Sequence, residues 1–107
     1  RKKKEEPPPV NPDGDSQLWL QEALPDPAAG PDAAYARQAL LASIHAALQA
    51  LPPQQRDVFL AHEIDGLSFA DMSAQWQVPQ NTLLARKRYA VLALRAQLQA
   101  EYGDLIV

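Results

Sequence analysis

The chain has 107 residues, a length that fits one small domain. It contains no cysteine and two isolated histidines, which excludes disulfides and thiolate metal sites and gives a histidine metal site little support. No stretch is apolar enough to span a membrane, no segment has the pattern of a secretory signal, and no nucleophile–base pair or phosphate-binding loop is present. We therefore expect a cytoplasmic protein that is not an enzyme, contacts no membrane and holds no metal or cofactor.

Charge is distributed unevenly along the chain, whose net charge is −3. Residues 1–31 contain four basic and six acidic residues, and residues 32–75 contain two and five. Residues 76–107 reverse this balance with four basic and two acidic residues. A local basic stripe matters more for phosphate attraction than the whole-chain charge, so the C-terminal third is the candidate for contact with nucleic acid.

Residues 1–31 are predicted to form a flexible proline-rich linker, since seven of the ten prolines lie there. The charged start, Arg1–Glu6, fits either a solvated chain end or a basic arm on nucleic acid. Within the linker, Leu18–Leu20 and Leu24 predict a short helical turn that docks on a partner, packs back onto this domain, or packs onto neighbouring copies in a crystal. We expect the first 30 residues to be mobile or held only by contacts with other chains.

Residues 32–107 are predicted to form an all-α domain of four helices without a strand. Apolar residues recur at helical spacing, Pro53 suits the first position of a helix, and Gly66 suits the left-handed residue that ends one. The expected helices span residues 33–50, 53–64, 68–76 and 80–101. The core is expected to combine ten apolar side chains: Leu48, Leu51, Val58, Phe59, Leu67, Met72, Trp76, Val78, Leu83 and Leu94.

The last two predicted helices form a helix-turn-helix. Ser68 is a natural N-cap, and Asp71 three residues later approximates a capping box. Pro79 forces Val78 out of the helical region and supplies the fixed φ that suits the edge of a new helix. Two helices joined by a short turn, the second beginning with polar residues and then Arg86–Arg88, are typical of a DNA-binding helix-turn-helix.

Several segments together resemble region 4 of the bacterial extracytoplasmic-function (ECF) sigma factors, which belong to the sigma-70 family. Ala47–Phe59 is similar to the opening of that region, with its Ala-Leu-x-x-Leu-Pro pattern followed by Gln-Arg and an apolar pair. Glu63–Ser68 matches the family pattern Glu-x-x-Gly-Leu-Ser, and Val78–Ala90 matches the recognition-helix pattern Val-Pro-x-x-Thr-Val-x-x-Arg. Each segment alone is a weak signal, but their order and spacing over about residues 33–98 are specific.

The resemblance implies a role in transcription initiation. Region 4 of these sigma factors places its helix-turn-helix on the promoter −35 element, docks on the flap of the RNA polymerase β subunit, and is often masked by an anti-sigma factor. The resemblance also implies that Arg1–Glu6 is the end of region 2 and that residues 7–31 link regions 2 and 4. The alternative is a sigma-like protein-interaction module that binds an anti-sigma factor or another regulator, with weak or no DNA binding.

The DNA-binding residues are expected at the starts of the last two helices. Gln80 and Asn81 have the amides that pair with adenine, and Arg88 has the guanidinium that pairs with guanine. Arg86 fits either a phosphate contact or an internal ion pair with Glu63 or Asp71. The complete candidate set is Ser68, Gln80, Asn81, Thr82, Leu84, Ala85, Arg86, Lys87, Arg88 and Tyr89.

The resemblance is incomplete at positions that matter for function. The family usually has glycine at the positions of Gln77 and Asn81. Lys87 replaces a usual leucine on the packed side, so its stem is expected to lie along apolar surface with the ammonium in water. Three positions that commonly face DNA have lost a cationic or hydroxyl side chain: Leu84, Ala85 and Tyr89. For this reason, substitution of Leu84 by lysine is expected to strengthen DNA binding.

Overall fold

The computed structural model describes residues 17–103, which fold into helices without any strand in that range. Two short elements come first, the α-helix α2 and the 3₁₀ helix η2, and four longer helices follow. In chain order they are α2 (Trp19–Ala23), η2 (Pro27–Ala29), α3 (Pro31–Gln49), α4 (Pro53–Glu63), α5 (Phe69–Trp76) and α6 (Gln80–Tyr102). The all-α class and the four main helices are confirmed, with bounds within two residues of the predicted ones. None of the helices in this range is long and apolar enough to cross a membrane.

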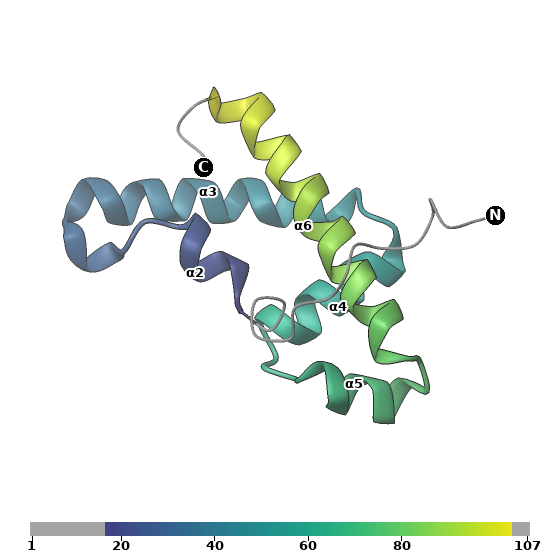
Figure 1. Cartoon of the computed structure of the whole chain (residues 1–107). Coiled ribbons are helices and arrows are strands. Elements are labelled where there is room, and N and C mark those ends of the chain that lie inside the picture. Colours follow the sequence, from purple (N-terminus) through teal and green to yellow (C-terminus); the bar gives the residue numbers. More distant parts are fainter. Residues whose placement is uncertain (1–16, 104–107) are drawn as a thin grey trace.

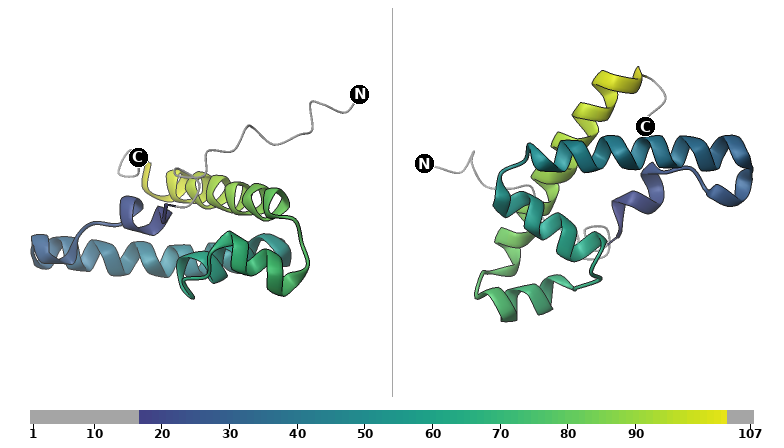
Figure 2. Two further views of the ribbon diagram at one scale, coloured as in Figure 1. Left: turned by 60° about the horizontal axis from the view of Figure 1, so that its bottom comes forward. Right: turned by 180° about the vertical axis from the view of Figure 1, so that it is seen from behind.

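The helices are arranged in two layers. Helix α3 is long and α6 crosses it obliquely, while α4 and α5 lie toward the other end of α6 (Figure 1). Seen from the side, α6 and α2 lie on the same side of α3 and α4 (Figure 2). The N-terminal half of α3 and η2 extend away from the other helices (Figure 1). The short helix α2 therefore sits where α3, α4 and α6 come together.

Local sequence signals fix the ends of the main helices. Pro31 and Pro53 occupy the first positions of α3 and α4, where their missing N–H groups cost no helical hydrogen bond. After α4, Gly66 adopts a φ of 76°, a conformation that strains residues with a side chain. This turn lets the Leu67 N–H donate to the Ala61 carbonyl at 3.0 Å and brings the chain round into α5.

The first core cluster lies between α2, α3, α4 and α6. Its buried members come from all four helices, so α2 is part of the core rather than an appendage. They are Trp19, Leu24, Leu40, Ile44, Leu48, Phe59, Ala90, Leu94 and Leu98. Burial of this apolar surface is the main favourable contribution to folding of this part of the domain.

The second core cluster holds the helix-turn-helix together. It joins α4, α5 and the first turns of α6 through Val58, Ala61, Phe69, Met72, Leu83 and Leu84. Successive residues of an α-helix point about 100° apart, so the neighbours Val58 and Phe59 supply different clusters. Helix α4 is therefore shared between the two clusters and ties the helix-turn-helix to the rest of the domain.

The expectation that the first 30 residues are mobile, or held only by other chains, is wrong for residues 17–30. Trp19 and Leu24 are only 8% and 7% exposed, and the Arg37 guanidinium donates to the Pro25 carbonyl at 3.1 Å. The open alternative of a helical turn that packs back onto the domain is the one observed. The physical reason is that the large apolar indole of Trp19 is buried between α3, α4 and α6. Arg1–Glu6 and the first prolines lie outside the described residues.

The predicted core also needs one correction. Trp76 has 37% of its surface exposed and belongs to neither cluster, although its spacing from Phe69 and Met72 places it on their face of α5. Helical spacing sets the direction of a side chain but not whether a neighbouring element covers it, and Trp76 is the last residue of its helix. Leu51, Leu67 and Val78 are partly buried against the clusters, and the remaining six predicted core residues are buried.

Candidate nucleic-acid interface

The turn between α5 and α6 has a left-handed residue, Gln77, with φ 60° and ψ 42°. Its N–H donates to the Ser73 carbonyl at 2.9 Å, and its side-chain amide donates to the Ala74 carbonyl at 2.9 Å. Val78 then packs partly against the second cluster, and Pro79 precedes the first residue of α6. These contacts set the direction in which α6 leaves the turn.

Both helices of the motif present their N-terminal ends at the surface. The exposed Ser68 accepts a hydrogen bond through Oγ from the Asp71 N–H at 3.0 Å and so caps α5. Helix α6 follows Pro79 without a side-chain cap, and Gln80 and Asn81 in its first turn are exposed. Helix N-termini carry partial positive charge and N–H groups that suit phosphate oxygens.

The outer face of α6 consists of Asn81, Ala85, Tyr89 and Leu92, which follow each other at spacings of three or four residues. Asn81, Tyr89 and Leu92 are exposed, while Ala85 is half-buried. Five of the six buried residues of the same helix lie on the opposite side: Leu83, Lys87, Ala90, Leu94 and Leu98. At about 100° per residue, the half-buried Arg86 and Arg88 flank the outer face on its two edges.

Most of the predicted site residues lie at this surface. Gln80, Asn81 and Tyr89 are exposed on α6, Ser68 is exposed at the start of α5, and a further four are half-buried: Thr82, Ala85, Arg86 and Arg88. Two do not fit a direct contact with DNA, namely Leu84 and Lys87.

Leu84 lies inside the domain. It is 9% exposed and belongs to the second core cluster, together with Met72 of α5 and Leu83 of α6. The resemblance predicts Leu84 beside the DNA, because basic residues are usual at that position in the family. In this chain the leucine is apolar and α5 lies close enough to cover it, so it stabilises the helix-turn-helix core instead.

Lys87 is also buried, with 5% of its surface exposed. The expectation that its ammonium lies in water is therefore wrong. Its Nζ lies 2.9 Å from Oε2 of Glu63, whose side chain is fully buried, and donates to Nδ1 of His62. The ammonium also lies 5.6 Å from the centroid of the Phe59 ring. Glu63 therefore pairs with Lys87 rather than with Arg86, and the ion pair considered for Arg86 with Asp71 does not occur within residues 17–103.

The Glu63 carboxylate has two further partners that the sequence did not indicate. Its Oε2 accepts the Trp19 N–H at 2.7 Å, and its Oε1 accepts the Leu20 N–H at 3.2 Å. These are the first two residues of α2, and they lie more than 40 positions away in the sequence. No local sequence signal connects residues so far apart. We call this arrangement, in which one carboxylate holds both the start of α2 and Lys87 of α6, the Glu63 junction.

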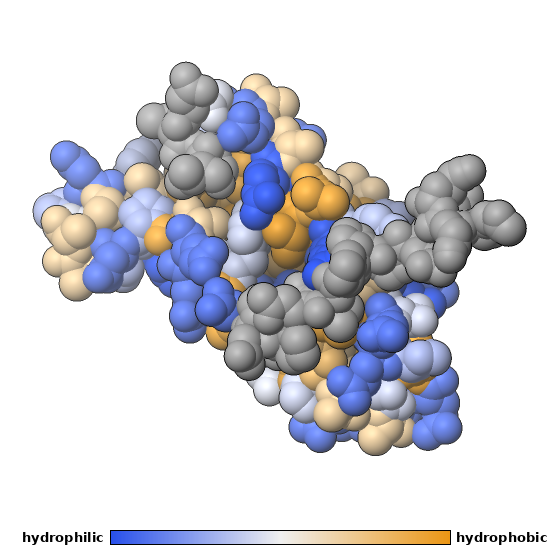
Figure 3. Space-filling model, viewed as in Figure 1, coloured by the Kyte–Doolittle hydropathy of each residue, from blue (hydrophilic) through white to orange (hydrophobic). Residues whose placement is uncertain are grey.

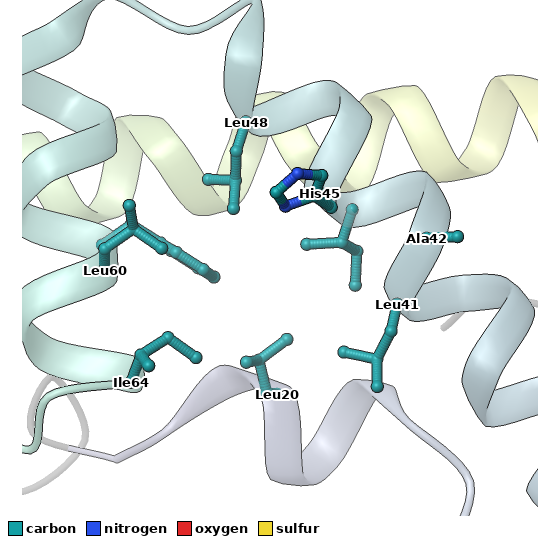
Figure 4. Close-up of a pocket in the computed structure, with 9 residues that line it drawn as sticks. Leu20, Leu41, Ala42, His45, Leu48, Leu60 and Ile64 are labelled. Carbon is teal, nitrogen blue, oxygen red and sulfur yellow. The ribbon is translucent and has the colours of Figure 1, made fainter.

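A pocket of about 390 Å³ opens on another part of the domain, between α2, α3 and α4 (Figure 4). Leu20, Leu41, His45 and Ile64 point toward its middle, and its lining is apolar apart from the histidine (Figure 4). None of its lining residues belongs to α6. The space-filling view shows hydrophilic side chains over much of one face, with apolar side chains gathered beside α6 near its middle (Figure 3). Within residues 17–103, no group of three or more side chains is placed to hold a metal ion.

An all-α domain that ends in a helix-turn-helix, with the outer face of its second helix at the surface, defines a DNA-binding domain of the helix-turn-helix class. The family model for sigma-70, region 4, matches residues 41–95, a little over half of the chain. The chain therefore belongs to the sigma-70 family, in which region 4 is a DNA-binding transcription factor domain that engages promoter DNA and RNA polymerase. This is not an enzyme family. No curated protein and no solved structure was found to match the chain.

Proposed function

We propose that this domain is region 4 of an ECF sigma factor and that it recognises the promoter −35 element through the outer face of α6. The observation that supports this proposal is that exposed amides and half-buried arginines lie together at the start of α6. Gln80 and Asn81 are exposed in the first turn, and Arg86 and Arg88 flank the outer face one to two turns later. Recognition helices of this class read base edges with residues at their N-terminal end.

Each of these residues has a distinct chemical role in the proposal. The amides of Gln80 and Asn81 offer the paired donor and acceptor that adenine presents in the major groove. Arg88 pairs with guanine or with a phosphate, and Arg86 on the other edge meets the backbone. The N-terminal ends of α5, at Ser68, and of α6 add phosphate contacts that fix the register of the helix on the duplex.

The remaining proposals concern the partners and the place of this domain in its protein. We infer docking on the flap of the RNA polymerase β subunit, masking by an anti-sigma factor and a cytoplasmic location, all supported by family membership. Residues 1–31 belong to the end of region 2 and the linker in this proposal, and residues 32–107 form region 4. The apolar pocket shares no residue with α6, so a protein partner on that pocket would leave the outer face of α6 available.

A protein-interaction module with weak or no DNA binding is the second candidate function. The observation that favours it is the exposure of two large apolar side chains on the outer face of α6, where Tyr89 is 46% exposed and Leu92 is 56% exposed. Such side chains are common at protein interfaces and give few polar contacts to base edges. The experiment below separates the two candidates.

The test is the binding of the full chain to a duplex enriched from a randomised pool, with a scrambled duplex as reference, followed by fluorescence anisotropy at two salt concentrations. We expect Arg88→Ala to weaken binding by about 1–3 kcal/mol and to relax one base preference if Arg88 contacts a base. If Arg88 contacts a phosphate, affinity should fall evenly across sequences and the salt slope should drop by about one.

Arg95→Ala is the matched control, because Arg95 is exposed on α6 two turns beyond Arg88 and its loss changes the net charge equally. It should bind both duplexes nearly as the unchanged chain does. Failure to enrich any duplex, or equal and salt-insensitive binding of the unchanged chain and Arg88→Ala, would favour the protein-interaction module.

A further inference from the structure

We propose that α2 is a strap whose docking fixes the recognition helix α6, and that Glu63 is the positioning residue that joins the two. The geometry behind this proposal is the Glu63 junction, in which one buried carboxylate binds the first two N–H groups of α2 and the Lys87 ammonium of α6. The docking of α2 through Glu63 does not depend on the proposed function. The effect on DNA affinity rests on the proposed function, and the experiments below test the two separately.

The first step is that α2 depends on Glu63. Helix α2 has five residues, and its N-cap, Leu18, provides no side-chain hydrogen bond. Isolated helices this short are not stable in water, because the first turn fixes many dihedral angles for one hydrogen bond. The Glu63 carboxylate supplies both the missing cap and a negative charge at the positive end of the helix. Without the carboxylate, the first turn of α2 loses both its cap and this favourable charge.

The second step is that Lys87 depends on the same carboxylate. Lys87 lies between Arg86 and Arg88, which flank the outer face of α6. Its ammonium is buried at 2.9 Å from Oε2 of Glu63, the same oxygen that accepts the Trp19 N–H. The Lys87 ammonium also donates to Nδ1 of His62, but a buried ammonium is destabilised when it loses a carboxylate at this distance, so we expect the turn of α6 that carries Lys87 to respond when the carboxylate moves.

The third step is that apolar packing connects α2 to α6 as well. Trp19 and Leu24 are buried in the first core cluster with Ala90 and Leu94 of α6. The Trp19 ring meets the Phe59 ring edge-on, with centroids 6.1 Å apart, and the Lys87 ammonium lies over that same Phe59 ring. Departure of α2 would therefore open the core beside α6 and expose the junction at the same time.

Two coupled events must influence each other equally. If docking of α2 favours the DNA-binding position of α6, then DNA bound to α6 must favour docking of α2 by the same factor. The proposal thus predicts that DNA protects Trp19, although Trp19 does not belong to the outer face of α6. This reciprocal effect is what distinguishes a strap from a segment that only adds stability.

Docking is measured first, in the absence of DNA. The chain has two tryptophans, so a Trp76→Phe background leaves Trp19 as the sole tryptophan, which is excited selectively at a wavelength where tyrosine does not absorb. In that background, Glu63→Gln should make Trp19 accessible to acrylamide and shift its emission to the red. Glu22→Gln is the matched control, since Glu22 is an exposed carboxylate of α2 and its loss changes the net charge equally. It should leave Trp19 protected.

The second measurement asks whether each substitution strengthens or weakens DNA binding. Both substitutions remove one negative charge, so general electrostatics predicts tighter DNA binding for each of them. The strap predicts instead that Glu63→Gln weakens binding relative to Glu22→Gln by about fivefold or more, the lower end of typical coupling between two sites. Leu24→Ala loosens α2 without touching the buried charges and should also weaken binding, which keeps the test valid if Glu63→Gln does not fold. In the Trp76→Phe background with Glu63 and Leu24 unchanged, added duplex should lower the acrylamide quenching of Trp19.

The possible results have separate meanings. If Trp19 stays protected in Glu63→Gln, Glu63 does not hold α2 and the proposal is overturned. If Trp19 is released but Glu63→Gln and Leu24→Ala bind DNA as tightly as Glu22→Gln, coupling to α6 is overturned while the proposed function stands. If the unchanged chain binds no duplex, the proposed function fails, and the strap is then judged by the quenching of Trp19 alone.

Discussion

Gln77 shows how a single residue stores strain at the turn of the motif. It is the one residue other than glycine with positive φ among residues 17–103, and it adopts a conformation that costs a residue with a Cβ atom about 1–2 kcal/mol. Its two hydrogen bonds, to the Ser73 and Ala74 carbonyls, offset part of that cost. A strained residue here holds the angle between α5 and α6, on which any contact with DNA depends.

Replacement of Gln77 by glycine should therefore stabilise the domain. We expect a gain of up to about 1 kcal/mol, because relief of the left-handed strain exceeds both the added entropy of glycine in the unfolded chain and the loss of the exposed side-chain hydrogen bond to Ala74. Gln75→Gly is the control, since Gln75 is exposed within α5 and glycine in a helix interior costs about 1 kcal/mol. Urea unfolding followed by circular dichroism measures both. A Gln77→Gly variant that loses as much stability as Gln75→Gly would show that Gln77 is not strained.

Leu84 gives a second prediction at the residue scale, and it reverses the sequence expectation for Leu84→Lys. Because Leu84 is buried in the second core cluster, a lysine there should destabilise the domain by roughly 3 kcal/mol or more and weaken DNA binding through loss of structure. Leu92→Lys places the same charge on the exposed outer face and should change stability by less than about 0.5 kcal/mol. Equal thermal midpoints for the two variants would mean that Leu84 is at the surface.

At the scale of elements, α2 extends the packed core into the N-terminal segment that the sequence predicts to be a flexible linker. A segment of five helical residues becomes part of the core because Trp19 is buried and Glu63 caps its first turn. Trp76, which the sequence assigned to the core, is left partly exposed at the end of α5. Of the two tryptophans, Trp19 is therefore the buried one, whereas the sequence pattern predicts Trp76 in the core.

This exchange predicts different stabilities for the two alanine variants. Trp19→Ala should cost about 3–5 kcal/mol, because it removes a buried indole and leaves a cavity in the first core cluster. Trp76→Ala should cost about 1 kcal/mol, near the average for single substitutions. Chemical denaturation of the full chain gives both values. A larger loss for Trp76→Ala than for Trp19→Ala would contradict the placement of α2 in the core.

The elements that sequence reasoning predicted well are those with strong local signals. Helices α3 to α6 have periodic apolar faces, and proline, serine and glycine mark several of their ends, so their bounds could be predicted closely. Helix α2 could not be predicted as part of the core, because its cap comes from Glu63, more than 40 residues away. Lys87 illustrates the same limit. Helical spacing places Lys87 on the packed side of α6. Its ion pair with Glu63 depends on how α4 and α6 cross, which the sequence does not indicate.

At the scale of the whole molecule, the charge that can meet DNA is smaller than the sequence suggests. Of the four basic residues after Trp76, Lys87 is buried in the Glu63 junction and Arg95 lies two turns beyond Arg88, past the last residue of the outer face of α6. Arg86 and Arg88 remain beside that face, together with the N-terminal ends of α5 and α6. With so few cationic contacts, an isolated domain should bind DNA weakly and depend on RNA polymerase for firm attachment to a promoter.

Amide chemical-shift mapping of the full ¹⁵N-labelled chain measures directly which surface meets DNA. On titration with the enriched duplex, we expect the largest shifts at Ser68–Asp71 and Gln80–Leu92, with smaller changes at Trp19 and Leu20 through the Glu63 junction. The pocket residues of α3 should not shift, and the scrambled duplex should produce smaller changes over the same residues. Shifts confined to the pocket between α2, α3 and α4, or no shift at any residue of α6 at saturating DNA, would contradict the account.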